Sequence, residues 1–194
     1  GSVTLPWITV GIDPPTATVE AGHVQAFTAN LQHDTLNAGV KWSLNRSSDY
    51  GTLSDVTSTT ATYKAPATAP QIPQYITLTA TSVTDPTALS SASITLPQST
   101  VSISPTGALL PLGVALTFTA SVSNDPGGTG VNWALTQSGA DCIPACGTIS
   151  SADATSVSYT PPATMPADPV VTLTATAVAD SVNARSIAIT LTAG

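Results

Sequence analysis

The stretch Gly39-Val40-Lys41-Trp42 occurs a second time, 91 residues later, as Gly130-Val131-Asn132-Trp133. Working outward, Phe27-Thr28-Ala29 returns at the same offset as Phe118-Thr119-Ala120. A repeat period above 90 residues is too long for a solenoid, but it matches one β-sandwich domain of about 100 residues. The sequence therefore predicts two copies of a whole domain.

The two copies differ in length after the shared tryptophan. The second copy carries a five-residue insertion in the stretch around Cys142, and the offset settles at 95 where Leu78-Thr79-Ala80-Thr81 matches Leu173-Thr174-Ala175-Thr176. The boundary falls near Pro97-Gln98-Ser99-Thr100. We therefore predict one domain over residues 1–98 and a second over residues 99–194.

Apolar residues alternate with polar ones along the chain. Phe27, Ala29 and Leu31 fall on one side of an extended segment, and Thr28 and Asn30 fall on the other. A period of two with one polar face is typical of antiparallel sheets that pack on one side. Turn residues between short strands predict an all-β fold of two tandem immunoglobulin-like antiparallel β-sandwich domains, with about seven strands each.

The aromatic residues fit this architecture. Six of the nine pair across the repeat, and we expect them in the cores: Phe27, Phe118, Trp42, Trp133, Tyr63 and Tyr159. A tryptophan on the third strand is the central plug of immunoglobulin sandwiches. Trp7, Tyr50 and Tyr75 have no counterpart. They are the candidates for a glycan-binding platform; alternatively, Trp7 covers the open end of the first strand and Tyr75 is buried.

The composition excludes several classes of partner. Charged residues make up 8% of the chain, and the net charge is −7. The basic residues are scattered: Lys41, Arg46, Lys64 and Arg185. Nucleic-acid binding requires clustered Lys and Arg, and anionic membranes attract the same clusters. No apolar run reaches the roughly 18 residues that cross a bilayer. We expect neither nucleic-acid binding nor membrane insertion.

The only cysteines, Cys142 and Cys146, lie within one short loop. In an exported protein this spacing indicates a local disulfide, and the alternative is a pair of reduced thiols. No histidine or further cysteine lies near enough in sequence to complete a tetrahedral metal site. The loop is either a staple, stabilising by roughly 2 kcal/mol or less, or a rigid finger that contacts a partner.

Nothing in the sequence indicates catalysis. A hydrolytic triad needs a nucleophile, a base and an orienting acid. The two histidines, His23 and His33, fall in turn or loop sequences, and their repeat equivalents are Val114 and Asn124. Motifs for phosphate, dinucleotide or zinc-protease chemistry are absent from the sequence. The sequence predicts a protein that is not an enzyme and has no organic cofactor.

Calcium is the one metal that the sequence leaves open. Asp34 and Asp85 fall in two loops that an immunoglobulin sandwich brings to one end, and Asp125 and Asp180 repeat the arrangement. Two carboxylates with loop carbonyls would begin a hard-oxygen site for Ca²⁺. The alternative is that these aspartates form turns, a common role for Asp before Pro or Ser.

The order of the repeated motifs resembles bacterial Ig-like domains. The matching stretches of the second copy are Val101-Ser102-Ile103-Ser104-Pro105, Phe118-Thr119-Ala120, Gly130-Val131-Asn132-Trp133, Cys146-Gly147-Thr148-Ile149-Ser150 and Leu173-Thr174-Ala175-Thr176. Such domains form tandem arrays in exported and surface proteins, including adhesins of the intimin and invasin type. The resemblance implies an extracellular or cell-surface location and a stalk or display role, and it supplies no catalytic residues.

Three functions are compatible with these features. The first is a non-catalytic spacer that presents neighbouring domains of a larger secreted or surface protein. The second is an adhesion module that binds a surface protein or a glycan through its loop ends. The third is an accessory region of a secreted enzyme.

Overall fold

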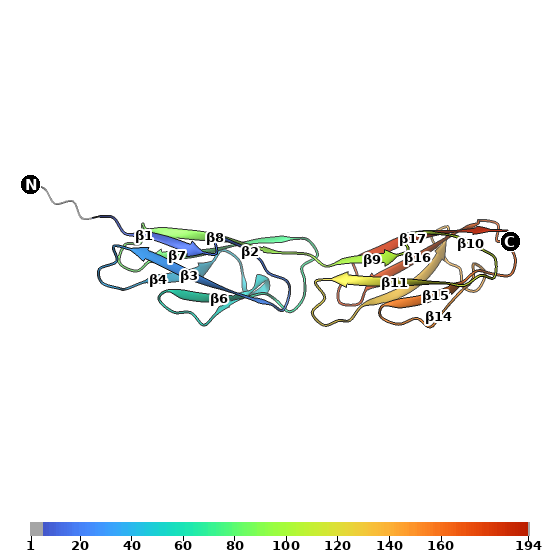
Figure 1. Ribbon diagram of the computed structural model, residues 1–194, viewed down its shortest axis with the longest axis horizontal. Helices are drawn as coiled ribbons and strands as arrows, with labels where there is room; N and C mark the ends of the chain where they lie inside the picture. The colour runs from blue at the N-terminus through green and yellow to red at the C-terminus, as the bar shows by residue number, and fades with distance from the viewer. Residues whose placement is uncertain (1–5, 194) are drawn as a thin grey trace, which may run out of the picture. The chain divides into compact units, whose positions relative to one another are not determined.

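The computed structural model describes residues 6–193, and the chain divides into two compact units, Gly1–Gln98 and Ser99–Gly194. Figure 1 shows β-strands throughout both units. The only helix among the described residues is the short 3₁₀ turn η1 (Ser48–Tyr50). It falls far short of the length and apolar character that a membrane-spanning helix requires.

Unit 1 is a sandwich of two four-stranded sheets. The first has the order β1-β3-β6-β5 and consists of β1 (Thr9–Asp13), β3 (Val24–Gln32), β6 (Thr60–Lys64) and β5 (Thr52–Ser54). The second has the order β2-β8-β7-β4 and consists of β2 (Thr16–Thr18), β8 (Leu89–Leu96), β7 (Gln74–Ser82) and β4 (Val40–Leu44). All neighbouring strands are antiparallel except β2, which runs parallel to β8.

Unit 2 repeats this arrangement and adds one strand. Its first sheet, in the order β14-β15-β11-β9, consists of β14 (Thr148–Ser150), β15 (Ser156–Thr160), β11 (Leu116–Ser123) and β9 (Thr100–Ser104). Its second, in the order β10-β17-β16-β12-β13, consists of β10 (Ala108–Pro111), β17 (Ala184–Thr192), β16 (Val170–Ala177), β12 (Val131–Gln137) and β13 (Ala140–Asp141).

The strand order is that of an immunoglobulin sandwich, in which the first, second, fifth and fourth strands form one sheet and the third, sixth and seventh form the other. The predicted fold class is therefore confirmed. The described residues hold eight strands in unit 1 and nine in unit 2, because the first strand of each unit is split in two. Pro14 and Pro105 lie at the split, where a residue without a backbone N–H interrupts the ladder. The ninth strand, β13, belongs to the insertion.

Each unit has its own core, built from the predicted alternating positions. Strand β7 buries Ile76, Leu78 and Ala80 and turns its threonines outward. The largest fully buried side chains are Tyr63, Phe27, Tyr159 and Phe118.

The prediction that Trp42 and Trp133 are central plugs is wrong. Both side chains are only partly buried, and each packs against the cluster of buried residues in its own unit. Tyr63 of β6 and Tyr159 of β15 are instead among the largest fully buried side chains, each with 0% of its surface exposed.

Candidate functional site

Three loops of unit 1 meet at one end of the sandwich. They are the loop 33–39 between β3 and β4, the turn 55–59 between β5 and β6, and the loop 83–88 between β7 and β8. Backbone hydrogen bonds join them: Val40 donates to the carbonyl of Ser58 at 2.8 Å, and Val83 donates to the carbonyl of Gly39 at 2.9 Å. The predicted site residues Asp34 and Asp85 both lie in this group of loops.

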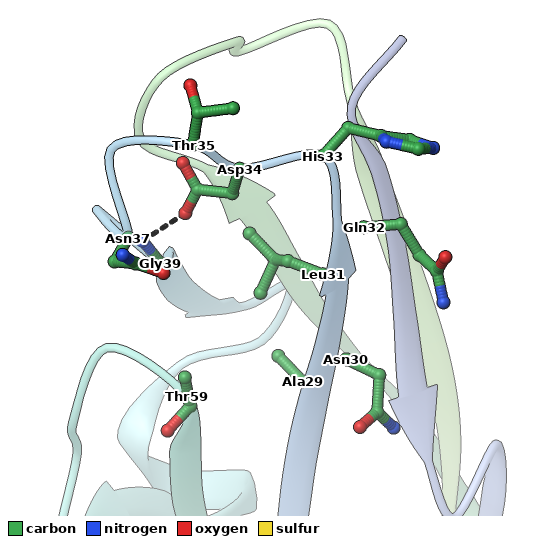
Figure 2. A pocket seen from close by; sticks show the side chains of 10 residues that line it. All are labelled: Ala29, Asn30, Leu31, Gln32, His33, Asp34, Thr35, Asn37, Gly39 and Thr59. Carbon is green, nitrogen blue, oxygen red and sulfur yellow. Dashed lines mark hydrogen bonds between the residues drawn. The ribbon is translucent and has the colours of Figure 1, made fainter. Parts of the chain in front are cut away.

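Asp34 locks these loops together. One carboxylate oxygen accepts the backbone N–H of Gly39 at 2.9 Å (Figure 2). The other accepts the hydroxyl of Thr84 at 3.1 Å. Gly39 has a φ of 72°, and a Cβ there would lie within 3 Å of Ser58. The Asp34 carboxylate therefore stabilises the loop 33–39 by a hydrogen bond to Gly39 and links it to the loop 83–88 by a hydrogen bond from Thr84.

Asp125 plays the same role in unit 2. Its carboxylate accepts the backbone N–H of Gly130 at 2.9 Å and the hydroxyl of Thr129 at 3.2 Å. Gly130 has a φ of 68°. The Asp and Gly five residues apart thus form one turn in both copies.

Asp85 and Asp180 form turns of their own. Asp85 accepts the hydroxyl of Thr87 at 2.7 Å and its backbone N–H at 3.0 Å, and these bonds lower the pKa of the carboxyl. Asp180 accepts the backbone N–H of Val182 at 3.2 Å and the side-chain amide of Asn183 at 2.7 Å. The carboxylates of Asp85 and Asp180 thus accept hydrogen bonds within their own turns, as the turn interpretation predicts.

The four aspartates belong to no larger group of acidic, histidine or cysteine side chains. Within residues 6–193, no group of three or more His, Cys, Asp or Glu side chains lies together in a way that fits a metal ion. Calcium binding at Asp34, Asp85, Asp125 and Asp180 stays a prediction.

A hollow of about 540 Å³ lies beside Asp34. Ala29, Leu31 and Thr59 line it together with the loop 33–39. Figure 2 shows the His33 ring directed away from Asp34, so the two side chains form no acid–base pair. His23 precedes the nine-residue strand β3, which places it about 30 Å from His33. The two histidines therefore do not lie together.

The predicted disulfide between Cys142 and Cys146 is present. Cys146 is fully buried in the core of unit 2, and Ile143, at the tip of the loop, is 51% exposed. The carbonyl oxygen of Cys146 also accepts the hydroxyl of Tyr159 at 2.7 Å. The burial and the hydrogen bond support the staple interpretation, and the finger interpretation stays a prediction.

In unit 2 the last residue of β12 and the residue after it contact the loop 161–169 that precedes β16. The side-chain amide of Gln137 donates to the backbone carbonyl of Asp168, and the hydroxyl of Ser138 donates to its carboxylate at 3.0 Å. Unit 1 lacks the insertion. Between its loops 45–51 and 65–73 lies a second hollow, of about 390 Å³. Tyr50 forms part of its lining, and the guanidinium of Arg46 lies 5.4 Å from the centre of the Tyr50 ring.

The other unpaired aromatics are exposed. Trp7 has 83% of its surface exposed and Tyr75 has 64%, so Trp7 does not cover the strand end and Tyr75 is not buried. Tyr50 is partly buried against the core of unit 1.

Asp153 is a structural residue that the sequence reasoning missed. Its carboxylate accepts the backbone N–H groups of Thr155 and Ser156, each at 2.7 Å, and these bonds lower its pKa to about 2. Its carbonyl accepts the indole N–H of Trp133 at 3.0 Å. The signal was the Asp-x-Thr-Ser sequence, a good turn former. The corresponding indole nitrogen of Trp42 is buried and has no partner.

Comparison with known proteins adds the following. No protein-family model matches the sequence, and no curated protein sequence matches it. Solved structures with a similar arrangement include the titin domains Z1Z2 in complex with telethonin, at 14% identity and a TM-score of 0.41, covering 95% of this chain and 96% of that one. The titin tandem A164–A165 has 12% identity and a TM-score of 0.38, covering 97% of this chain and 100% of that one.

A protocadherin gammaB7 fragment, EC3-6, described as a cis-dimer, has 16% identity and a TM-score of 0.39, covering 96% of this chain and 49% of that one. Likeness at these values carries no information on function. The assignment of the fold rests on the strand order and registers of the two units.

Proposed function

We propose that this chain is a non-catalytic structural module that spaces or presents other domains of a larger protein, exported to the surface of a bacterium or secreted from it. The observation that carries the proposal is the role of the residues shared by both copies. The repeated positions Phe27, Tyr63 and Leu78 are buried in the core. The repeated Asp34 and Gly39 lock a turn. The positions that the two copies share therefore serve the core and a turn of each sandwich.

The exposed sheet faces support the same role. Along β7 and β16 six of the outward positions are threonines, beside the exposed Tyr75 and Val170, and Thr174 pairs with Ser186 through their hydroxyl groups at 2.8 Å. Such a surface is hydrated and carries few charges. It suits a module that keeps its neighbours apart and does not gather them.

Export is supported by the disulfide between Cys142 and Cys146, because disulfides persist in oxidising compartments and are rare in the reducing cytosol. The bacterial origin rests on the resemblance of the repeated motifs to bacterial Ig-like domains. In this setting the partners of the chain are the neighbouring domains of the full-length protein.

Single-molecule extension tests the spacer role. The full chain is held between two handles and pulled at constant speed. A spacer made of two closed sandwiches predicts two separate unfolding events, each releasing a contour length of roughly 3.3–3.6 Å per residue of one unit, and both events recover on relaxation. Gradual extension at low force, without discrete events, would contradict the proposal, because such a chain holds no fixed spacing under tension.

A further inference from the structure

One end of unit 1 exposes large apolar side chains. It is the end at which the loops 33–39, 55–59 and 83–88 meet. Thr9 pairs with Gln32 there, so the residues that lead into β1 lie at this end as well. Four large apolar side chains on these loops and on the chain ends beside them are exposed: Trp7, Leu36, Val56 and Leu89. Exposed apolar side chains gathered in one region are typical of a surface that another protein domain covers.

The corresponding end of unit 2 lacks this apolar character. The repeat aligns the four residues with smaller or polar ones, in the same order: Gln98, Gly127, Ala152 and Ala184. The side-chain amide of Asn183 also donates to the hydroxyl of Ser99 at 2.8 Å. Unit 1 has Ala88 and Ile8 at these two positions, which form no such polar bond. The apolar end is therefore particular to unit 1 and is not a requirement of the fold.

The sequence directly before unit 1 indicates what covers this end. Val3-Thr4-Leu5-Pro6 matches Ile94-Thr95-Leu96-Pro97 at the offset of 91 that relates the two copies. In unit 1, Ile94 and Leu96 are fully buried at the end of the last strand, β8. The last strand of unit 2, β17, contains the same three residues as Ile189-Thr190-Leu191. Val3-Thr4-Leu5, which lies outside the described residues, thus has the sequence with which both last strands end.

We propose that the apolar end of unit 1 is a docking surface for a further sandwich of the same kind, which precedes unit 1 in the chain and whose last strand ends with Val3-Thr4-Leu5. This rests on the spacer role and names the partner at one end of the spacer. Leu5 and Trp7 are two residues apart, and two residues of extended chain span about 7 Å. A sandwich that ends at Leu5 is therefore held beside Trp7 and the loop 33–39. Contact with Trp7 and Leu36 would limit how far the two sandwiches swing against each other.

The test is a fusion in which residues 1–93 of an added copy are followed by residues 3–194 of the chain. Val3-Thr4-Leu5 then completes the last strand of the added copy. The emission of Trp7 is obtained as the difference between the fusion and its Trp7→Gln variant, and in the same way for the original chain. We expect the emission of Trp7 to lie at shorter wavelength in the fusion and to be quenched less by acrylamide, because docking removes the indole from water.

Three substitutions make the test specific. Leu36→Ser in unit 1 of the fusion returns the emission of Trp7 toward its value in the original chain, since an apolar contact is lost. Leu109→Ser is the matched control, because Leu109 is equally exposed but lies on β10 of unit 2. Val3→Ile gives the added copy the same last strand as unit 1 and so controls for its folding.

The proposal is overturned if Trp7 has the same emission in the fusion as in the original chain, or if Leu36→Ser and Leu109→Ser have equal effects. It is also overturned if the added copy folds only with Val3→Ile. Dimerisation of the original chain that Trp7→Gln abolishes would overturn it as well, because the occupant would then be a second chain. None of these outcomes bears on the spacer role, which the extension experiment tests separately on the original chain.

Discussion

The hydroxyl of Tyr159 donates a hydrogen bond to the carbonyl oxygen of Cys146 at 2.7 Å. In unit 1 the hydroxyl of Tyr63 makes the same bond to the carbonyl oxygen of Tyr50. Each bond ties the loop that follows the third strand to the strand β15 or β6 in the centre of the sandwich. The residue that carries the carbonyl differs between the copies, but the bond is the same, because it depends on backbone geometry.

Removing this hydroxyl is expected to destabilise the unit that loses it. Tyr159→Phe leaves the carbonyl of Cys146 without its partner, and the cost of an unsatisfied buried acceptor is about 1–3 kcal/mol. We expect the melting temperature of unit 2 to fall by roughly 5–10 °C, measured by calorimetry of the full chain. Tyr75→Phe is the matched control, since Tyr75 is largely exposed. An equal effect of both substitutions would show that the hydrogen bond is not the cause.

The glycine beside each of these carbonyls is expected to tolerate no side chain. Gly147 has a φ of 109°, and a Cβ there would lie 2.5 Å from the carbonyl oxygen of Thr160 and 2.8 Å from the ring of Tyr159. Gly147→Ala combines backbone strain with this clash, and we expect a loss above about 2 kcal/mol in the free energy of unfolding of unit 2.

Gly113→Ala separates the two effects. Gly113 has a φ of 74°, and nothing lies within 4 Å of a Cβ built there. Its substitution carries the strain alone, with an expected cost of about 1 kcal/mol. Denaturant unfolding measures both variants, and equal losses would contradict the steric clash of a Gly147 side chain with Thr160 and Tyr159.

Alkaline pH is expected to weaken both units. Burial raises the pKa of Tyr63 and of Tyr159 to about 12, from an ordinary value of 10.0. The folded chain therefore holds these protons more tightly than the unfolded chain does. The stability that this contributes is complete below pH 10 and is lost as the pH rises from 10 to 12.

The absorbance of tyrosinate measures this titration directly. The ionisation of Tyr63 and Tyr159 is expected to coincide with unfolding, because burial raises the pKa of both hydroxyls. In the Tyr63→Phe and Tyr159→Phe double variant, the fall in stability between pH 10 and 12 is reduced. A double variant with the wild-type pH dependence would contradict the assignment.

Reduction of the disulfide is expected to affect unit 2 alone. The ring between Cys142 and Cys146 is short, so its loss costs about 2 kcal/mol on the loop-entropy estimate. Cys142→Ala with Cys146→Ala adds a cavity, because Cys146 is fully buried. In the wild type, a reducing agent lowers the melting temperature of unit 2 and leaves that of unit 1 unchanged. A shift of both transitions would show that the two units do not unfold independently.

The fold follows from the sequence because alternation and repetition are both visible there. Phe27 and Ala29 alternate with polar neighbours, and a period of two with one polar face leaves few architectures. The alignment of the two copies places the insertion around Cys142. The short spacing between Cys142 and Cys146 predicts their disulfide. The repeat of Asp34 as Asp125 marked a turn, and the structure shows both bonded to a glycine.

The remaining features depend on contacts between residues that are distant in sequence, which no local sequence pattern predicts. Trp42 fits the plug position by its place on the third strand, but it is only partly buried, whereas Tyr63 is fully buried. The hollow beside Asp49 lies between two loops that are distant in sequence, and no local pattern predicts a space between them. The partners of Asp153 lie in its own turn, but its carbonyl meets Trp133 from another strand.

The central claim is that the chain contains two copies of one self-sufficient scaffold. The most direct test is to express residues 1–98 and 99–194 separately and unfold each with denaturant. We expect each half to unfold in one cooperative transition, with a denaturant dependence that matches its own buried surface. If neither half folds without the other, the chain is one larger sandwich, and the two-unit account is wrong.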